Sequence, residues 1–465
     1  MFESLRQIGE LLREENLPIE KPREGQLVKI IFDLDKKEIT HDLLSSGEER
    51  AREYLWVGNV KGNKPQLRLT TDKIEYLLNK PDQKHHKWAI DAIIKYLEKG
   101  GIDERNKDFY EILKKIKKVF FGYKQHMTED FIKYLEGQGI SKKSVSLYTV
   151  SVKRNGIIKD LVKDPTYREL LISNLYSEGD LAKGICHVCG ERKDILLNPA
   201  YPPGSFLIIY NVDKAGFLSG ISREPAAYLR THTVCPDCKR NLVLGANFVK
   251  EKLRIRIPRA FDIFIIPKVH GLTSPDLLHK LTEKTVGIFS VAKAYKTLKE
   301  VEETIEDFKR FIEEERQIAV TYSLYLLFGA SAQSSFAYYG LVQNVPVTRL
   351  LKIANEAALI SQDVADLFQE DIAKWSIGLD TIAEIYPVRK HEWKTLAELL
   401  VAIFGARGYP SAEVIKRALL LAKIIRFKTY EGYNIKSKGQ GFYDEFLCRS
   451  LLKYNMFLLM MRRIG

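Results

Sequence analysis

The sequence lacks the signatures of several common protein classes. It contains no Gly-x-x-x-x-Gly-Lys-Ser/Thr loop, so ATP hydrolysis at a phosphate-binding loop is not expected. No run reaches the roughly 18–20 apolar residues that a membrane-spanning helix needs, and the first residues carry charge without an apolar signal core. No Ser/His/Asp or Cys/His arrangement for nucleophilic catalysis can be recognised. These absences favour a cytoplasmic binding protein, without a membrane partner, over an enzyme.

Cysteine is scarce, with five residues in 465, which argues against a disulfide framework and for a reducing compartment. Four of the five form two Cys-x-x-Cys pairs, Cys186 with Cys189 and Cys235 with Cys238. This spacing lets the two thiolates of a pair coordinate one metal ion, and two pairs together supply the four ligands of a tetrahedral site. Because four thiolates leave no open position, we predict a structural Zn²⁺ rather than a catalytic metal.

The residues alone leave alternatives to this zinc site. The two pairs could be unrelated or could form a redox site, and iron could take the place of zinc. His187 and His232 lie beside the pairs, and either could replace a cysteine as a ligand. With four cysteines present, both histidines are expected to be bystanders. The fifth cysteine, Cys448, lies in an apolar helical segment and is expected in a core.

Positive charge is in excess and is unevenly distributed. The chain has 73 Lys and Arg against 60 Asp and Glu, a net charge of +13. From Val401 to the end there are 12 basic and 4 acidic residues, a net charge of +8. An excess of this kind favours a polyanionic partner. The candidate nucleic-acid contacts lie at a hairpin tip, on a basic strand and in the C-terminal region: Lys153, Arg154, Asn155, Arg254, Arg256, Arg259, Lys416, Arg417, Lys423, Arg426, Lys436 and Lys438.

The pattern of apolar residues changes along the chain. Strands mixed with helices are expected before residue 345, including Val145–Val152 followed by the hairpin signal Asn155-Gly156. After Pro346 only helices are expected, at Thr348–Glu370, Trp393–Phe404, Ala412–Phe427 and Phe442–Arg463. The predicted fold class is therefore α+β: a mixed α/β N-terminal domain with an inserted zinc-binding subdomain that carries the four paired cysteines, then an all-α helical bundle.

This pattern predicts four regions. Residues 1–180 form the N-terminal α+β region, and residues 181–250 form the zinc-binding subdomain. Residues 251–345 continue the N-terminal domain, and residues 346–465 form the C-terminal bundle.

Several separate stretches together resemble one family. They are 184–190 and 233–238 around the cysteines, 213–220 between them, and 264–268 and 345–350 downstream, together with the opening Phe2-Glu3-Ser4-Leu5. Their order and spacing are similar to the large subunit of type I-B CRISPR interference complexes (Cascade), a zinc-containing family. The similarity is specific around the cysteines and at 345–350, and looser elsewhere.

The resemblance implies a non-catalytic role in antiviral defence. Such a subunit binds the complex at the CRISPR RNA 5′ handle and contacts the other Cascade subunits, both backbone and handle-binding. It helps recognise the protospacer-adjacent motif in double-stranded DNA and helps open the duplex. It also binds the displaced strand and docks the nuclease-helicase. The C-terminal helices would then be similar to the small subunit.

Two other functions remain open on the sequence alone. A stand-alone zinc-containing nucleic-acid-binding regulator would show the same cysteines and the same positive charge. A metal-dependent nuclease could use His41-Asp42, the dipeptide of HD phosphohydrolases, although the further His and Asp ligands such a site needs cannot be assembled from the sequence.

Overall fold

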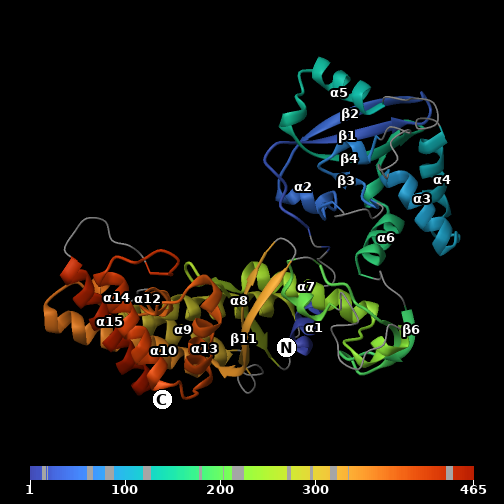
Figure 1. The fold of residues 1–465 in the computed structure, drawn as a ribbon. Helices are drawn as coiled ribbons and strands as arrows, with labels where there is room; N and C mark the ends of the chain where they lie inside the picture. Colours follow the sequence, from blue (N-terminus) through green and yellow to red (C-terminus); the bar gives the residue numbers. More distant parts are fainter. Residues whose placement is uncertain are drawn as a thin grey trace. The chain divides into compact units, whose positions relative to one another are not determined.

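The computed structural model describes most of the chain and divides into two compact units. The described residues are 1–12, 17, 19–59, 66–78, 88–118, 127–176, 181–202, 204–211, 225–269, 274–293, 297–314, 322–332, 335–435 and 443–465. One unit comprises Glu15–Glu178, and the other comprises Met1–Glu14 together with Gly179–Gly465 (Figure 1).

The Glu15–Glu178 unit is built on a five-stranded sheet (Figure 1). Its strands run in the order β2 (Glu38–Ser45), β1 (Gln26–Asp33), β4 (Val145–Arg154) and β3 (Thr70–Thr71), with β5 (Ile157–Asp160) also paired to β4. The β1–β4 pair is parallel and the other pairs are antiparallel. Leu27, Val28, Ile30 and Phe32 of β1 are buried in the core, as expected of a central strand.

Helices complete this first unit and bury the apolar faces of the sheet. Their bounds are α2 (Glu48–Glu53), α3 (Ala89–Gly100), α4 (Lys107–Ile116), α5 (Met127–Gly137) and α6 (Pro165–Tyr176), with short 3₁₀ turns at Ile74–Tyr76, Lys142–Ser144 and Leu161–Lys163. The predicted hairpin is confirmed. Asn155 and Gly156 both have positive φ, 51° and 76°, which is the backbone of a two-residue hairpin turn.

The second unit contains a four-stranded antiparallel sheet in the order β11 (Phe336–Pro346), β10 (Ser323–Ser331), β9 (Asp262–Lys268) and β8 (Arg254–Arg256). A separate hairpin joins β6 (Leu181–Ile185) to β7 (Arg192–Leu196). Residues 251–345, which were expected to continue the N-terminal domain, lie in a different compact unit from Glu15–Glu178. Their strands hydrogen-bond to one another and form a sheet of their own within the other compact unit.

The N-terminal helix α1 (Phe2–Leu11) belongs to the second unit and packs directly on α7 (Pro236–Lys252). Two glycines permit this contact. A Cβ added at Gly9 would lie 1.8 Å from the carbonyl oxygen of Asn241, and one added at Gly245 would lie 2.1 Å from that of Leu5. The two helix backbones therefore approach each other as closely as only glycine allows.

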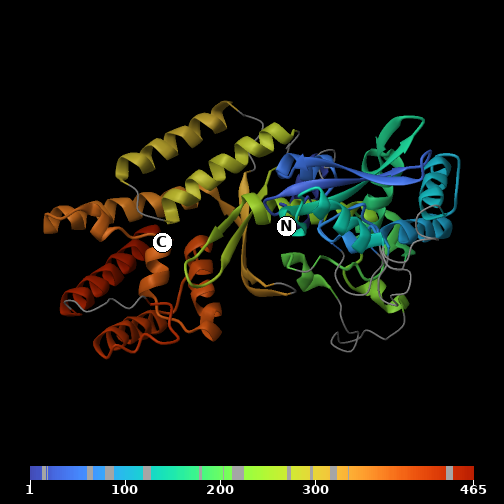
Figure 2. The ribbon, with the colours of Figure 1, turned by 90° about the horizontal axis from the view of Figure 1, so that it is seen from above.

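Helices α8 (Pro275–Lys293) and α9 (Leu298–Glu314) follow β9 and lie side by side (Figure 2), joined at their surface by Lys284 and Asp307 at 2.6 Å. Strands β10 and β11 come next, and from Val347 onward the described chain is mainly helical. Its helices are α10 (Val347–Phe368), α11 (Ile372–Trp375), α12 (Leu379–Ile385), α13 (Trp393–Gly405), α14 (Ser411–Arg426) and α15 (Tyr443–Ile464), with a 3₁₀ turn at Lys390–Glu392.

The mixed α/β class with a helical C-terminal region is thus confirmed, and the four long C-terminal helices lie within a few residues of their predicted bounds. These helices do not form a compact unit of their own, because α10 packs on α8 and α9, and α13 packs on β11. Cys448 is exposed on α15 instead of lying in a core. Among the described helices, none has the length and hydropathy needed to cross a membrane.

Candidate metal centre and nucleic-acid surfaces

The first cysteine pair lies in the turn between β6 and β7. Cys186 follows β6, its N–H donates to the carbonyl of Glu191 at 2.9 Å, and the N–H of Gly190 donates to the carbonyl of Cys186 at 2.8 Å. Gly190 adopts φ +74°, a left-handed conformation that glycine takes without strain. This tight turn brings the thiols of Cys186 and Cys189 to the same side.

The second pair lies at the start of α7. Cys235 is the N-cap residue, and its sulfur accepts the N–H of Cys238 at 3.4 Å. Pro236 occupies the first helical position, where its missing N–H costs nothing. The segment before the helix is held against the first turn, since the N–H of Leu196 donates to the carbonyl of Val234 at 2.8 Å and that of His187 to Thr233 at 3.0 Å.

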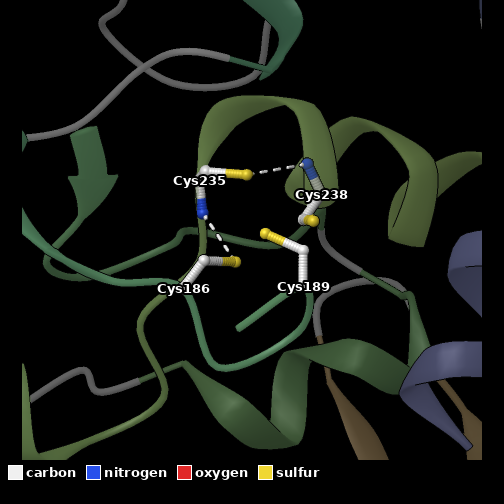
Figure 3. A group of neighbouring side chains, drawn as sticks. All are labelled: Cys186, Cys189, Cys235 and Cys238. Carbon is white, nitrogen blue, oxygen red and sulfur yellow. Dashed lines mark hydrogen bonds between the residues drawn. The ribbon is translucent and has the colours of Figure 1, made fainter. Parts of the chain in front are cut away.

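The four sulfurs converge on one point. All four lie within 4.8 Å of one another, and their side chains point toward a common centre from the two turns (Figure 3). The N–H of Cys235 also donates to the sulfur of Cys186 at 3.3 Å, which links the two pairs directly. Cys186, Cys235 and Cys238 are buried and Cys189 is half-buried.

The electrostatics of the cluster favour a bound cation. Hydrogen bonds from the thiols of Cys235 and Cys238 hold the pKa of the Cys186 thiol far below its ordinary value. Their reciprocal effect, led by Cys186, raises the pKa of Cys238. Four sulfurs this close cannot all ionise unless a positive ion lies between them, whereas a bound ion keeps all four as thiolates. The N-terminus of α7 adds a favourable partial positive charge beside Cys235 and Cys238.

The donor set fits a metal ion held for structure. Four thiolates from two Cys-x-x-Cys turns are the ligand set of structural tetrahedral sites, and they leave no position for substrate. Among the described residues this cluster is the group that could hold a metal, and it includes neither histidine. The ring Nδ1 of His187 instead accepts the N–H of Thr233 at 3.4 Å.

His232 is part of an aromatic cluster beside the metal centre. Its ring stacks on Phe2 of α1 at a centroid distance of 4.8 Å, and its Nε2 lies 2.6 Å from the hydroxyl of Tyr201. Burial, and then the charge of His187, lower the pKa of His232 to about 4, so its ring is neutral at pH 7. This cluster connects the start of the chain to the cysteine-bearing segment.

The hairpin candidates lie at one end of the five-stranded sheet. Arg154 and Asn155 are exposed at the tip, while Lys153 is half-buried and pairs with Asp33 at 3.3 Å. Sequence reasoning missed the neighbouring turn between β1 and β2, where Lys36 and Lys37 are exposed. Because β1 and β4 are parallel, this turn and the hairpin reach the same sheet edge, a proximity that no local sequence signal reveals.

The basic-strand candidates lie on β8, at the edge of the four-stranded sheet. Arg254 and Arg256 are exposed, and both approach the buried carboxylate of Asp262, at 3.8 and 3.6 Å. Arg259 is exposed in the following turn with φ +58°. One carboxylate therefore faces two guanidinium groups, and this corner retains positive charge.

The C-terminal candidates separate into different environments. Lys416, Lys423 and Arg426 are exposed on α14, whereas Arg417 is buried with its side chain 5% exposed. Its guanidinium donates to Glu413 at 2.7 Å and to the carbonyl of Pro387 at 2.9 Å, and approaches Glu392 at 3.4 Å. Arg417 is held by partners within the fold, which argues against its assignment as a nucleic-acid contact. Lys436 and Lys438 lie outside the described residues.

We therefore expect Arg417→Met to act on stability. Removing the guanidinium deprives the Pro387 carbonyl of its donor and takes a cation from Glu413 and Glu392, which keep only Lys416 and the N–H of Arg389. This should lower the free energy of unfolding by about 2–3 kcal/mol. The exposed neighbour Lys416→Met should change it by less than about 0.5 kcal/mol. Chemical denaturation compares the two variants. Wild-type stability in Arg417→Met, together with weaker nucleic-acid binding, would restore Arg417 as a nucleic-acid contact.

The nuclease alternative gains no support from His41. This residue lies on β2 with its ring edge-to-face on Tyr134 of α5, 5.2 Å between centroids. Burial lowers its pKa. Within the described part of the chain, no cluster of metal-ligating side chains includes His41 or Asp42.

Two protein-family models match the chain. The model for the N-terminal domain of CRISPR-associated protein TM1802 matches residues 1–173, and the model for the central domain of the same family matches residues 183–345. Together they cover well over half of the chain, including the hairpin and the four cysteines. Residues 346–465 lie outside both matches. No curated protein matches the chain.

Proposed function

The chain belongs to the CRISPR-associated TM1802 family, and from this membership we propose that it is a non-catalytic large subunit of a CRISPR RNA-guided DNA surveillance complex. In such a complex, base pairing with the guide reads the target, while protein reads a short motif and the backbone. The proposed partners are CRISPR RNA, target duplex DNA, the other Cascade subunits and the nuclease-helicase. The observation that carries the proposal is the match of both family models in sequence order.

We assign motif recognition and duplex opening to the "tip surface", defined as Lys36, Lys37, Arg154, Asn155 and Ile157. Its backbone is firmly held. The N–H of Asn155 donates to the carboxylate of Asp35 at 2.6 Å, and the N–H of Leu34 donates to the carbonyl of Lys153 at 3.0 Å. Because these two turns are already rigid, they can present side chains to a duplex with little loss of conformational entropy on binding.

The side chains of the tip surface suit contact with duplex DNA. Lys36, Lys37 and Arg154 are exposed cations; the acids beside them are Asp35, whose carboxylate accepts the N–H of Asn155, and Glu38, which is exposed at the start of β2. Ile157 is opposite Arg154 in the hairpin and is 72% exposed. Cations can neutralise phosphates while an exposed aliphatic side chain enters a groove or separates neighbouring bases.

We assign displaced-strand binding in part to the β8 corner. Arg254, Arg256 and Arg259 are exposed there around the single buried acid Asp262. Single strands are held by positive surfaces that follow the backbone without reading sequence. The metal centre is proposed to hold Zn²⁺, whose role is to fix the β6–β7 turn to the start of α7.

The tip surface yields a direct prediction. In the assembled complex, Arg154→Glu should weaken binding to target duplex several-fold and lower the slope of log K against log salt by about 0.9 for each phosphate that is no longer neutralised. The matched control is Lys99→Glu on α3, an exposed lysine in the same unit with the same change of charge. Filter binding at several salt concentrations measures both. If the two variants weakened duplex binding equally, the tip surface would not be part of the DNA interface.

The isolated chain distinguishes this proposal from the regulator alternative. A complex subunit should bind duplex DNA alone in a salt-dependent manner without sequence preference, and should become selective only with guide RNA and the other subunits. Tight and selective binding by the chain alone would favour a stand-alone zinc-containing regulator. Competition with unrelated DNA of equal length, with and without the other components, measures the difference.

A further inference from the structure

Helix α14 presents an unusual face to solvent. Val414, Arg417, Leu421 and Ile424 are turned inward and buried. On the opposite side Ile415 and Leu419 are 59% and 67% exposed, one helical turn apart, and Ala412 is exposed on the same face. A solvated helix face normally carries polar residues, so this apolar row indicates a surface that another molecule covers.

Positive charge runs along one side of this row. Lys416 and Lys423 are exposed at i and i+7, and Arg426 and Phe427 are exposed at the C-terminal end of the helix. The helix contains one acidic residue, Glu413. Glu413 is half-buried, and its carboxylate accepts from Arg417 at 2.7 Å and also lies 3.6 Å from the ammonium of Lys416, which remains 69% exposed. We call this face, formed by Ala412, Ile415, Lys416, Leu419 and Lys423, the "α14 face".

A cavity opens at the N-terminal end of the α14 face. Its volume is about 720 Å³, and it lies between the end of α13 and the start of α14. Ala412 and Lys416 belong to both the cavity wall and the exposed face, and Val401, Ala402 and Pro410 add apolar lining. The other charged residues of the wall are Arg407, Arg417, Glu398 and Glu413. A cavity of this size can accept a large side chain from a docked partner, as anchor residues do at protein interfaces.

We propose that the α14 face docks an amphipathic helix of a partner protein, one that carries apolar residues at helical spacing and a row of Asp or Glu beside them. The apolar row of α14 would pack on the apolar row of the partner helix. Lys416 and Lys423 would face its acids, and one large side chain would enter the cavity. This inference does not depend on the proposed function, and it assigns Lys416 and Lys423 to a protein rather than to phosphates.

Charge and chemistry disfavour the other occupants. A second copy of the same face would bring Lys416, Lys423 and Arg426 against their own counterparts, and like charges across an interface are repulsive. Nucleic acid would satisfy the lysines but would leave Ile415 and Leu419 beside phosphates and sugars. Surfaces that bind single strands use aromatic side chains for stacking instead.

Site-specific photo-crosslinking in the native cell tests the proposal with the full chain. The probe is Ile415→p-benzoylphenylalanine, and the control is the same replacement at Glu303, exposed on the charged helix α9. The crosslinked peptide is sequenced by mass spectrometry. We expect a peptide from a different protein, with acids and apolar residues at helical spacing. Adding Lys416→Glu with Lys423→Glu should lower its yield at least about fivefold, as expected when two charge pairs become repulsive.

Each other outcome overturns the proposal. Crosslinks to nucleotides, to another copy of this chain, or to a peptide without acidic residues would assign the face to a different occupant. A yield no greater than that of the Glu303 control would mean that the face is not covered. If the double charge reversal left the crosslinking yield unchanged, the partner would not place acidic residues against Lys416 and Lys423. Because the replaced side chains are exposed, thermal unfolding of the variants should match the wild type, which separates loss of docking from loss of fold.

Discussion

Replacing Cys238 by serine is expected to lower the free energy of unfolding of the Cys-bearing unit by at least about 3 kcal/mol, or roughly 6–12 °C in Tm. Cys238 is buried at the start of α7, and its sulfur is one of four that converge within 4.8 Å. A hydroxyl is a poor ligand for a soft metal, so the metal should bind weakly or be lost. The three sulfurs that remain, two of them buried, would then be crowded together without a compensating cation.

The matched control is Cys448→Ser. Cys448 is exposed on α15 and lies outside the cluster, so the same chemical change there should alter stability by less than about 0.5 kcal/mol. Elemental analysis should find one thiophilic metal per chain in the wild type and in Cys448→Ser, and less in Cys238→Ser. Removing the metal with a chelator should reproduce the loss of stability. A wild-type protein that contains no metal, and whose stability a chelator does not change, would contradict the structural metal site.

Gly9→Ala and Gly245→Ala should each destabilise the same unit by about 3 kcal/mol or more. The added Cβ would lie 1.8 Å from the Asn241 oxygen in the first case and 2.1 Å from the Leu5 oxygen in the second. Both obstacles are backbone carbonyls, which cannot swing aside as a side chain can. Helix α1 must therefore move off α7, and the cost should exceed the usual 1–3 kcal/mol of an overpacked core.

Gly287→Ala serves as the control for this pair. Gly287 lies within α8, and a Cβ added there meets no atom within 4 Å. Because alanine favours the helix over glycine, that substitution should be neutral or stabilise by up to about 1 kcal/mol. Thermal unfolding of the three variants gives the comparison. Equal stability in all three would show that α1 does not rest against α7 in solution.

The features that could be predicted from the sequence are those determined by residues close together in the chain. Two Cys-x-x-Cys pairs are a specific spacing, and the structure brings their four sulfurs together as predicted, although the identity of the metal remains a prediction. Asn155-Gly156 predicted its hairpin because few residues other than Asn and Gly adopt positive φ easily. The family resemblance, drawn from short stretches on both sides of the cysteines, is confirmed by the family models.

What could not be predicted depends on contacts between distant segments. The docking of α1 on α7 joins residues more than 200 positions apart through two glycines that look ordinary in the sequence. Lys36 and Lys37 gain significance only because β1 and β4 are parallel neighbours. Arg417 resembles its exposed neighbours on α14 in the sequence, yet its position on the helix turns it inward to Glu413 and the Pro387 carbonyl. Residues 213–220 of the resemblance lie outside the described chain.

The most direct test of the proposed function is purification of the tagged full chain from its native cell, followed by mass spectrometry of the proteins and sequencing of the RNA that accompany it. A complex subunit should bring with it the backbone-forming CRISPR subunits and a processed guide RNA in stoichiometric amounts. The Cys448→Ser variant should recover the same set, whereas Cys238→Ser should recover less. Recovery of the stable wild-type chain without guide RNA or CRISPR subunits would contradict the proposal.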